Sequence, residues 1–206
     1  ARAGLVDASR VRLIPGSGVD CSRFQPDLDR ETGGRLRVLL PARLLWDKGL
    51  AEYAQAARLL HAEGRPIDFL LAGDPDPGNP AAVPEAEVRE WVGQGVVQWL
   101  GHVEDMRALL RSVDVVALPS YREGLPKGLI EAAASGCALV TTDVPGCREV
   151  VTHEVDGLLV QVRDGDALAK AIARLHEDPA LRARLADAGR RKALERFDER
   201  IVIRKT

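Results

Sequence analysis

The sequence predicts an α/β domain with a parallel sheet, and three observations support this. Short runs of consecutive apolar residues alternate with amphipathic segments along most of the chain. The runs are continuous rather than alternating in polarity, as in strands that are buried on both faces of a parallel sheet. The length of 206 residues suffices for one substantial domain and is too short for two large ones. Together these observations predict a doubly wound, Rossmann-like architecture.

The individual elements follow from the apolar runs and from the helix start and stop signals between them. The predicted strands are 11–16, 36–42, 67–73, 96–101, 114–120, 138–142 and 157–162. The predicted helices are 48–63, 84–95, 104–113, 127–136, 164–178 and 179–197. Asp164 is placed to cap the helix that follows it.

Composition and charge limit the classes of function that the chain can have. The net charge of -2 gives no electrostatic reason for binding nucleic acid. No window contains the roughly 18 apolar residues of a membrane span. Three cysteines without a C-x-x-C spacing fit reduced thiols in the cytoplasm. The stretch 182–205 is locally basic, and we expect a solvated helix face there, with peripheral association at the inner face of an anionic membrane as the alternative.

Two cations follow the strongest predicted strand. Arg43 and Lys48 lie in the loop after 36–42, and doubly wound sheets bind their ligands beyond the carboxyl ends of the strands. A guanidinium fork and an ammonium group at this edge can neutralise a diphosphate. The alternative is that Arg43 pairs with a surface acid and that Lys48 belongs to the helix start, although a cation there opposes the helix dipole.

A second loop of this kind follows a later strand, in the stretch YREGLPKGLIEAAASG (121–136). Gly124 allows a ligand to approach the backbone, Pro126 fits the first helical turn, and the free N–H groups of that turn can bind an anion. Glu131 is expected on the second turn, where its carboxylate can accept hydrogen bonds from vicinal hydroxyls. Glu123 precedes the helix and can face the rest of the ligand. The alternative is a pair of solvated glutamates beside an apolar helix face.

Two further stretches carry weaker signals. TTDVPGCREVV (141–151) follows another predicted strand, and its Pro-Gly pair is predicted to form a turn at the same edge of the sheet. Asp74-Pro75-Asp76 has the D-x-D spacing of a metal-binding signature. Because it lies in a proline-rich loop, we predict a turn there and no metal.

In combination, these motifs resemble a known family. The chain resembles the donor-binding domain of the GT-B retaining glycosyltransferases of family 4, the glycosyl transferases group 1. The resemblance rests on the R…KG loop, on the E-x7-E frame of Glu123 and Glu131, and on the flanking EGLPKGLIEAAASG and TDVPGCREVV. The likeness covers about residues 11–197. It implies that 1–206 is a single donor-binding domain, one half of a two-domain enzyme whose N-terminal, acceptor-binding half is absent. A chain that begins with Ala1 rather than Met agrees with a part of a longer protein.

The resemblance also implies roles for individual residues. The nucleotide diphosphate would be held by Arg43 and Lys48 with the backbone of Gly124, Leu125 and Pro126. The ribose would be bound by Glu131, the transferred sugar by Glu123, and the base by His102 and Val103, with a solvated loop histidine as the alternative for His102. Arg43, Lys48 and Glu123 are the candidate catalytic residues, because the two cations stabilise charge that grows on the leaving diphosphate.

The function implied by the resemblance is sugar transfer with retention of anomeric configuration. The donor would be a nucleotide-diphosphate sugar, with a UDP-sugar favoured. The acceptor would be a saccharide or a lipid-linked saccharide in polysaccharide or cell-envelope biosynthesis. No cofactor or metal is expected, and the isolated domain is expected to be inactive alone. The alternatives are another GT-B enzyme, such as a nucleotide-sugar epimerase or a sugar phosphorylase, and a non-catalytic nucleotide-binding module.

Overall fold

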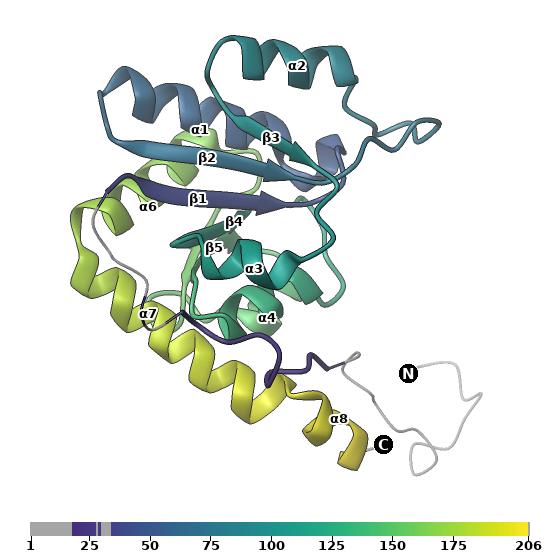
Figure 1. Cartoon of the computed structure of the whole chain (residues 1–206), viewed down its shortest axis with the longest axis vertical. Helices are drawn as coiled ribbons and strands as arrows, with labels where there is room; N and C mark the ends of the chain where they lie inside the picture. The colour runs from purple at the N-terminus through teal and green to yellow at the C-terminus, as the bar shows by residue number, and fades with distance from the viewer. Residues whose placement is uncertain (1–17, 28, 30–33, 206) are drawn as a thin grey trace.

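The computed structural model describes residues 18–27, 29 and 34–205, and it shows a six-stranded parallel sheet flanked by helices (Figure 1). The strand order is β3-β2-β1-β4-β5-β6. The strands are β1 (Leu36–Pro41), β2 (Ile67–Ala72), β3 (Gln98–Gly101), β4 (Val115–Leu118), β5 (Ala138–Thr142) and β6 (Leu158–Val160). The doubly wound α/β fold is confirmed, and the strand predicted at 11–16 lies outside the described residues.

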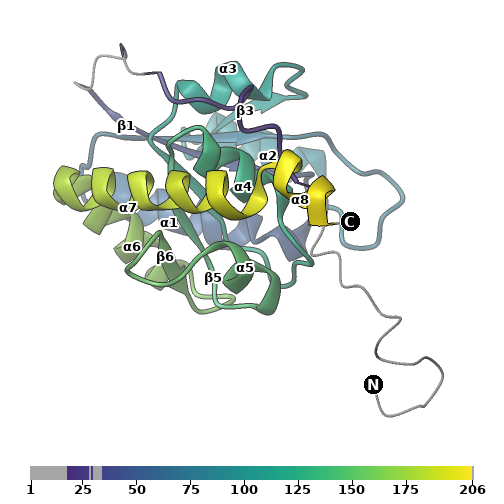
Figure 2. The ribbon, with the colours of Figure 1, turned by 90° about the horizontal axis from the view of Figure 1, so that it is seen from below.

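Helices cover both faces of this sheet. They are α1 (Leu50–Ala62), α2 (Glu85–Gly93), α3 (Met106–Arg111), α4 (Lys127–Ala134), α5 (Pro145–Val150), α6 (Gly165–Glu177), α7 (Pro179–Lys192) and α8 (Glu199–Lys205). A 3-10 turn, η2 (Trp46–Lys48), precedes α1, and a π-helical turn, η3 (Ala193–Phe197), follows α7. α1 and α6 lie side by side on one face, and α3 and α4 lie on the other (Figures 1 and 2). The predicted cap of α6 is confirmed, since Asp164 accepts a hydrogen bond from the Ala167 amide at 2.7 Å.

Two helices, α5 and α8, differ from what the sequence predicted. The turn predicted at Pro145-Gly146 is wrong, because α5 begins at Pro145, where a helix needs no N–H donor and the fixed φ of proline suits the first turn. α8 was not predicted. It begins after Asp198, whose backbone is extended and interrupts the helical run.

The core is built from the continuous apolar strands. Every residue of β4 and β5 is buried, as expected for central strands of a covered parallel sheet. α1 is anchored to the sheet by Tyr53, whose fully buried hydroxyl lies 2.9 Å from the carbonyl oxygens of Val38 and Leu70. A buried polar group of this kind needs such partners, so α1 has one position over β1 and β2.

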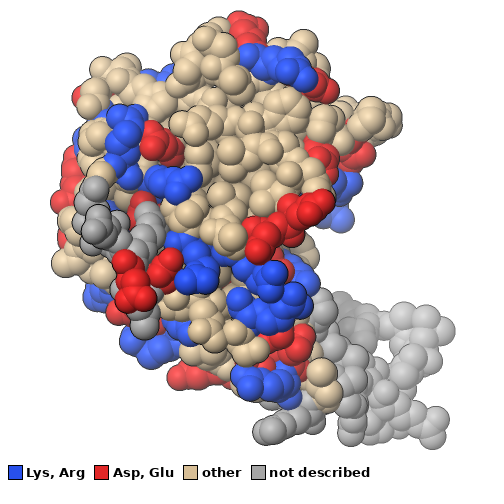
Figure 3. Space-filling model, viewed as in Figure 1, with Lys and Arg blue, Asp and Glu red and all other residues tan. Residues whose placement is uncertain are grey.

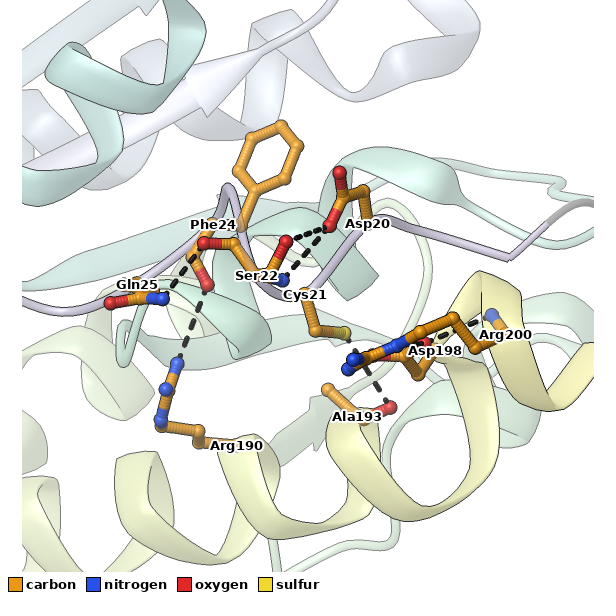
Figure 4. A network of polar contacts seen from close by, with 9 residues as sticks. All are labelled: Asp20, Cys21, Ser22, Phe24, Gln25, Arg190, Ala193, Asp198 and Arg200. Atoms are coloured by element: carbon orange, nitrogen blue, oxygen red, sulfur yellow. Dashed lines mark hydrogen bonds and ion pairs between the residues drawn. The ribbon is translucent and has the colours of Figure 1, made fainter.

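The first described segment is joined to the end of the chain (Figure 4). The Val19 amide donates to the Phe197 carbonyl at 2.9 Å, and the Glu199 amide donates to the Val19 carbonyl at 3.0 Å. Nearby, the buried thiol of Cys21 lies against the Ala193 carbonyl at 3.8 Å. Cys21, Cys137 and Cys147 are all buried, and none of the three is in a disulfide. The two ends of the described chain therefore close on one another.

Much of the basic C-terminal stretch is used within the fold. Lys192 pairs with Asp156 at 3.0 Å, with both side chains largely buried, and Arg190 donates to the carbonyl of Ala134. Arg182 donates to the Leu175 carbonyl at 2.6 Å. These cations are thus not simply solvated, and acidic and basic side chains are interspersed over the lower part of the face in Figure 3. Within the described chain, no helix has the length and apolarity to cross a membrane.

Candidate functional site

The candidate site lies where the strand order reverses. β1 and β4 are neighbours, with Val38 opposite Val115, and the connections that follow them lead to opposite faces of the sheet. Ligands of doubly wound sheets bind in the crevice at this point, beyond the carboxyl ends of the strands. The loop after β1 holds Arg43 and Lys48, and the loop after β4 holds Glu123. The two loops that the sequence singled out are therefore adjacent in space.

The loop after β1 is shaped by a glycine. Gly49 has φ +76, a left-handed conformation that other residues rarely adopt, and a methyl group at this position would overlap the Pro119 carbonyl. The close approach places η2 and its last residue, Lys48, directly against the end of β4. Glycine is thus required at position 49 for both conformation and space.

Lys48 and Glu123 form an ion pair. The Lys48 Nζ lies 2.8 Å from Glu123 Oε1, and the side chains are 23% and 12% exposed, respectively. The residue predicted to bind diphosphate and the residue predicted to contact the sugar therefore meet in one partly buried pair. The attraction between the two charges is stronger in a partly buried site than in water, and removing either partner leaves a poorly solvated charge.

The aspartates of the D-x-D stretch have partners of their own. Asp76 pairs with Arg43 at 2.6 Å, so the surface ion pair considered as the alternative for Arg43 is present. Asp74 lies 2.8 Å from Nδ1 of His102. Within the described chain, no group of three His, Cys, Asp or Glu side chains is arranged to hold a metal ion. Both carboxylates thus join the β2 loop to neighbouring loops.

Four of the predicted residues line one pocket of about 260 Å³ at the ends of β1 and β2. They are Arg43, His102, Val103 and Glu131, joined by Gly128 and Met106 among others. Gly128 leaves this space open, because a Cβ there would meet only the Pro41 ring, at 3.9 Å. The lining of this pocket does not include Lys48 or Glu123. The site therefore has two parts, a pocket and an adjacent ion pair.

The start of α4 is open. The helix begins at Lys127, so Pro126 precedes the first turn rather than lying within it, and no side chain caps the helix. Uncapped N-terminal N–H groups favour an anion. A Cβ added to Gly124 would meet no atom within 4 Å, so there is open space beside this residue. Glu131 lies on the second helical turn, as predicted.

Burial raises the pKa of the Glu131 carboxyl above its usual value of 4.5, against the opposing effect of Lys127 at 3.6 Å. The folded state then holds the proton more tightly than the unfolded chain, so stability falls as the pH rises through this window. We expect Glu131→Gln to melt at a higher temperature than the wild type at about pH 8 and at the same temperature at about pH 3. Differential scanning calorimetry at the two pH values measures this.

A control of opposite sign is available in Glu154. Arg174 lowers the pKa of the Glu154 carboxyl, so Glu154→Gln is expected to lower the melting temperature at about pH 8 and to leave it unchanged at about pH 3. A less stable Glu131→Gln variant at the higher pH would contradict the assignment of desolvation as the dominant effect on Glu131.

Sequence reasoning missed three residues at this edge of the sheet. The Tyr121 hydroxyl donates to Oε1 of Glu52 at 2.8 Å, and the Arg163 guanidinium lies 4.8 Å from the centre of the Tyr121 ring. Tyr121 belongs to the stretch 121–136, but its partners come from α1 and from the loop after β6. No spacing in the sequence joins these three segments.

The geometry agrees with a comparison to known protein families. The model of the family named glycosyl transferases group 1 matches residues 35–178, which include every candidate site residue. The chain belongs to the glycosyl transferases group 1 family. The resemblance inferred from the sequence motifs is therefore confirmed.

Two relatives are glycosyltransferases whose names include a diphospho-undecaprenol-linked sugar. The chain is 36% identical over 165 residues to the N,N'-diacetylbacillosaminyl-diphospho-undecaprenol alpha-1,3-N-acetylgalactosaminyltransferase of Campylobacter jejuni, covering 80% of this chain and 42% of the relative. It is 28% identical over 187 residues to the UDP-Gal:alpha-D-GlcNAc-diphosphoundecaprenol alpha-1,3-galactosyltransferase of Escherichia coli, covering 85% and 48%. The chain thus spans less than half the length of these two relatives.

Solved structures confirm the fold. A glycosyltransferase from Rickettsia africae superposes with a TM-score of 0.83 at 20% identity, over 97% of this chain and 56% of that chain. The structural neighbours are GT-B glycosyltransferases.

Proposed function

We propose that this chain is the donor-binding domain of a retaining glycosyltransferase and that it binds a nucleotide-diphosphate sugar, with a UDP-sugar favoured. The observation that carries the proposal is the partly buried Lys48–Glu123 pair beside the pocket that contains Arg43 and Glu131. A cation next to a carboxylate suits a ligand whose anionic diphosphate adjoins a hydroxyl-rich sugar. UDP-Gal, the donor named for the Escherichia coli relative, supports the favoured base.

In the proposed complex the ligand is divided between the two parts of the site. Glu131 would accept hydrogen bonds from the ribose hydroxyls, with the base near His102 and Val103 in the same pocket. The diphosphate would lie between the pocket and Glu123, over the open start of α4. The backbone of Gly124, Leu125 and Pro126 would face it there.

The proposed reaction follows from these positions. The diphosphate would replace Glu123 and Asp76 as the partner of Lys48 and Arg43, which releases Glu123 to contact the transferred sugar. The bond between the anomeric carbon and the diphosphate oxygen breaks, and its electron pair leaves with the diphosphate, where the two cations stabilise the growing charge. The acceptor hydroxyl attacks on the same face and passes its proton to the leaving oxygen, so the configuration is retained. This mechanism requires no metal.

The rest of the enzyme is part of the proposal. An N-terminal domain outside this chain would bind the acceptor, so this domain alone would bind donor and not transfer sugar. The group transferred would be a hexosyl or N-acetylhexosaminyl group. Because both relatives are named for diphospho-undecaprenol acceptors, a lipid-linked saccharide at the inner, cytoplasmic face of a membrane is the proposed acceptor.

A nucleotide panel tests the donor class. We expect UDP and UDP-N-acetylgalactosamine to raise the melting temperature of the chain more than GDP, ADP or their sugars, because a ligand that binds only the folded state stabilises it.

Glu131→Ala is expected to weaken binding of UDP about tenfold in calorimetry, through loss of a charged hydrogen-bond acceptor. Glu177→Ala, which changes an exposed acid on α6, is the matched control. If no nucleotide in the panel bound, the proposed function would be overturned.

A further inference from the structure

Tyr121 joins the two loops that form the candidate site. Its amide donates to the Asp47 carbonyl at 2.8 Å, one residue before Lys48. Its hydroxyl donates to Oε1 of Glu52, on the first turn of α1, also at 2.8 Å. Glu123 follows two residues later. Tyr121 is thus hydrogen-bonded to the loop that carries Lys48 and lies two residues before the residue with which Lys48 pairs.

The carboxylate that receives this hydroxyl is in an unfavourable environment. Glu52 is only 8% exposed, and its second carboxylate oxygen, Oε2, has no hydrogen-bond partner within the described chain. A buried acceptor without a partner costs more than a typical hydrogen bond contributes. Core packing alone would be better served by an apolar residue here.

Arg163, which contacts the tyrosine ring, has a strained backbone. Within the described chain, Arg163 (φ 58) and Glu154 (φ 66) are the non-glycine residues in the left-handed region. That conformation is unfavourable for a residue with a side chain, and such strain clusters at functional sites. The conformation brings the Arg163 guanidinium to 4.8 Å from the centre of the Tyr121 ring, a cation–π contact.

The backbone on which Tyr121 stands is held as well. The hydroxyl of Thr141 donates to the Leu118 carbonyl at 2.7 Å, and that of Thr142 donates to the Ser120 carbonyl. The Tyr121 hydroxyl stays protonated at physiological pH and can donate to Glu52, because burial and the Glu52 carboxylate raise its pKa to about 12. The tyrosine is therefore fixed at its backbone, its ring and its hydroxyl.

Two unfavourable features thus converge on one side chain: an oxygen of Glu52 that has no partner within the described chain, and the left-handed backbone of Arg163. Their convergence points to a role in the site. We propose that Tyr121, held by Glu52 and Arg163, is a positioning residue that sets the distance between Lys48 and Glu123 and thereby the affinity for the diphosphate and the sugar. This inference rests on the proposed function. Because these residues do not line the pocket with Glu131, the nucleoside part of the ligand should be unaffected.

The test compares two ligands that share a nucleoside. Calorimetry measures the affinity of the chain for UMP and for UDP-N-acetylgalactosamine. Tyr121→Phe is expected to lower the affinity for UDP-N-acetylgalactosamine about tenfold and to keep the affinity for UMP within about twofold of the wild type. The reason is that losing a hydrogen bond to a charged group loosens the loop but not the pocket. Glu52→Ala should behave in the same way, whereas Glu52→Gln, which keeps an acceptor for the tyrosine, should restore most of the affinity. The double variant Tyr121→Phe/Glu52→Ala should be no worse than either single variant.

Arg163→Gly separates positioning from folding. Glycine relieves the left-handed strain, so the melting temperature should stay within about 2 °C of the wild type, while UDP-N-acetylgalactosamine binds several-fold more weakly. Glu154→Gly is the matched control: it replaces the other left-handed residue, at the opposite end of β6, and should leave both affinities unchanged.

The outcomes distinguish the two proposals. The positioning role is supported if the wild-type chain binds UDP-N-acetylgalactosamine and if Tyr121→Phe and Arg163→Gly lower the affinity for this ligand but not the affinity for UMP. If the wild type binds but the variants weaken both ligands equally, or neither, the positioning role is wrong and the donor site stands. A wild-type chain that binds no nucleotide overturns the donor site and the positioning role with it.

Discussion

Lys48→Ala is expected to lower the affinity for UDP and UDP-sugars by at least about 100-fold, the largest effect on binding at this site. Two losses combine. The diphosphate loses an ammonium group, and the Glu123 carboxylate, only 12% exposed, loses its partner at 2.8 Å. An unpaired and poorly solvated carboxylate would then face the incoming phosphates and repel them.

The double variant Lys48→Ala/Glu123→Gln tests this explanation. Removing the charge of Glu123 should recover about tenfold of the UDP affinity, because the repulsion disappears while the missing cation does not return. Lys170→Ala, which changes an exposed lysine on α6, is the control for a general loss of positive charge and should bind UDP like the wild type. Calorimetry gives all four affinities. Lys48→Ala binding within about threefold of the wild type would refute the role of Lys48.

Gly49→Ala is expected to destabilise the fold by about 3 kcal/mol, the largest effect on stability. A side chain at φ +76 costs about 1–2 kcal/mol, and the added methyl group would overlap the Pro119 carbonyl, so that η2 or the end of β4 must move. Lys48 precedes this glycine and Tyr121 follows Pro119 closely. The surviving folded protein should therefore also bind UDP more weakly.

Gly93→Ala is the matched control for a glycine-to-alanine change. Gly93 ends α2 with no atom within 4 Å of an added Cβ and with a negative φ, so alanine should stabilise the fold by up to about 1 kcal/mol. Urea unfolding curves measure both variants. Equal stability of Gly49→Ala and the wild type would show that the loop after β1 can rearrange freely, contrary to the close contact with Pro119.

The sequence by itself determined the fold class and the edge of the sheet at which the candidate residues lie. Its continuous apolar strands predicted a parallel sheet, and in such a sheet the loops after the strands share one edge, so Arg43, Lys48, Glu123 and Glu131 could be assigned to that edge without a structure. The turn predicted at Pro145 failed because a Pro-Gly pair begins a helix as readily as it forms a turn, and only the packing of Gly146 against the Glu123–Gly124 backbone decides between them.

Only the tertiary structure decided which charges are partners. Lys48 pairs with Glu123, 75 positions away, and Arg43 pairs with Asp76, 33 positions away; the order of the strands, not spacing along the chain, determines such contacts. The same holds for Tyr121, whose partners Glu52 and Arg163 come from α1 and from the loop after β6. Sequence periodicity reports the local environment of a residue in its own helix or strand, whereas a site between loops depends on how the sheet is assembled. That assembly brings the Lys48–Glu123 pair and Tyr121 together in one candidate site.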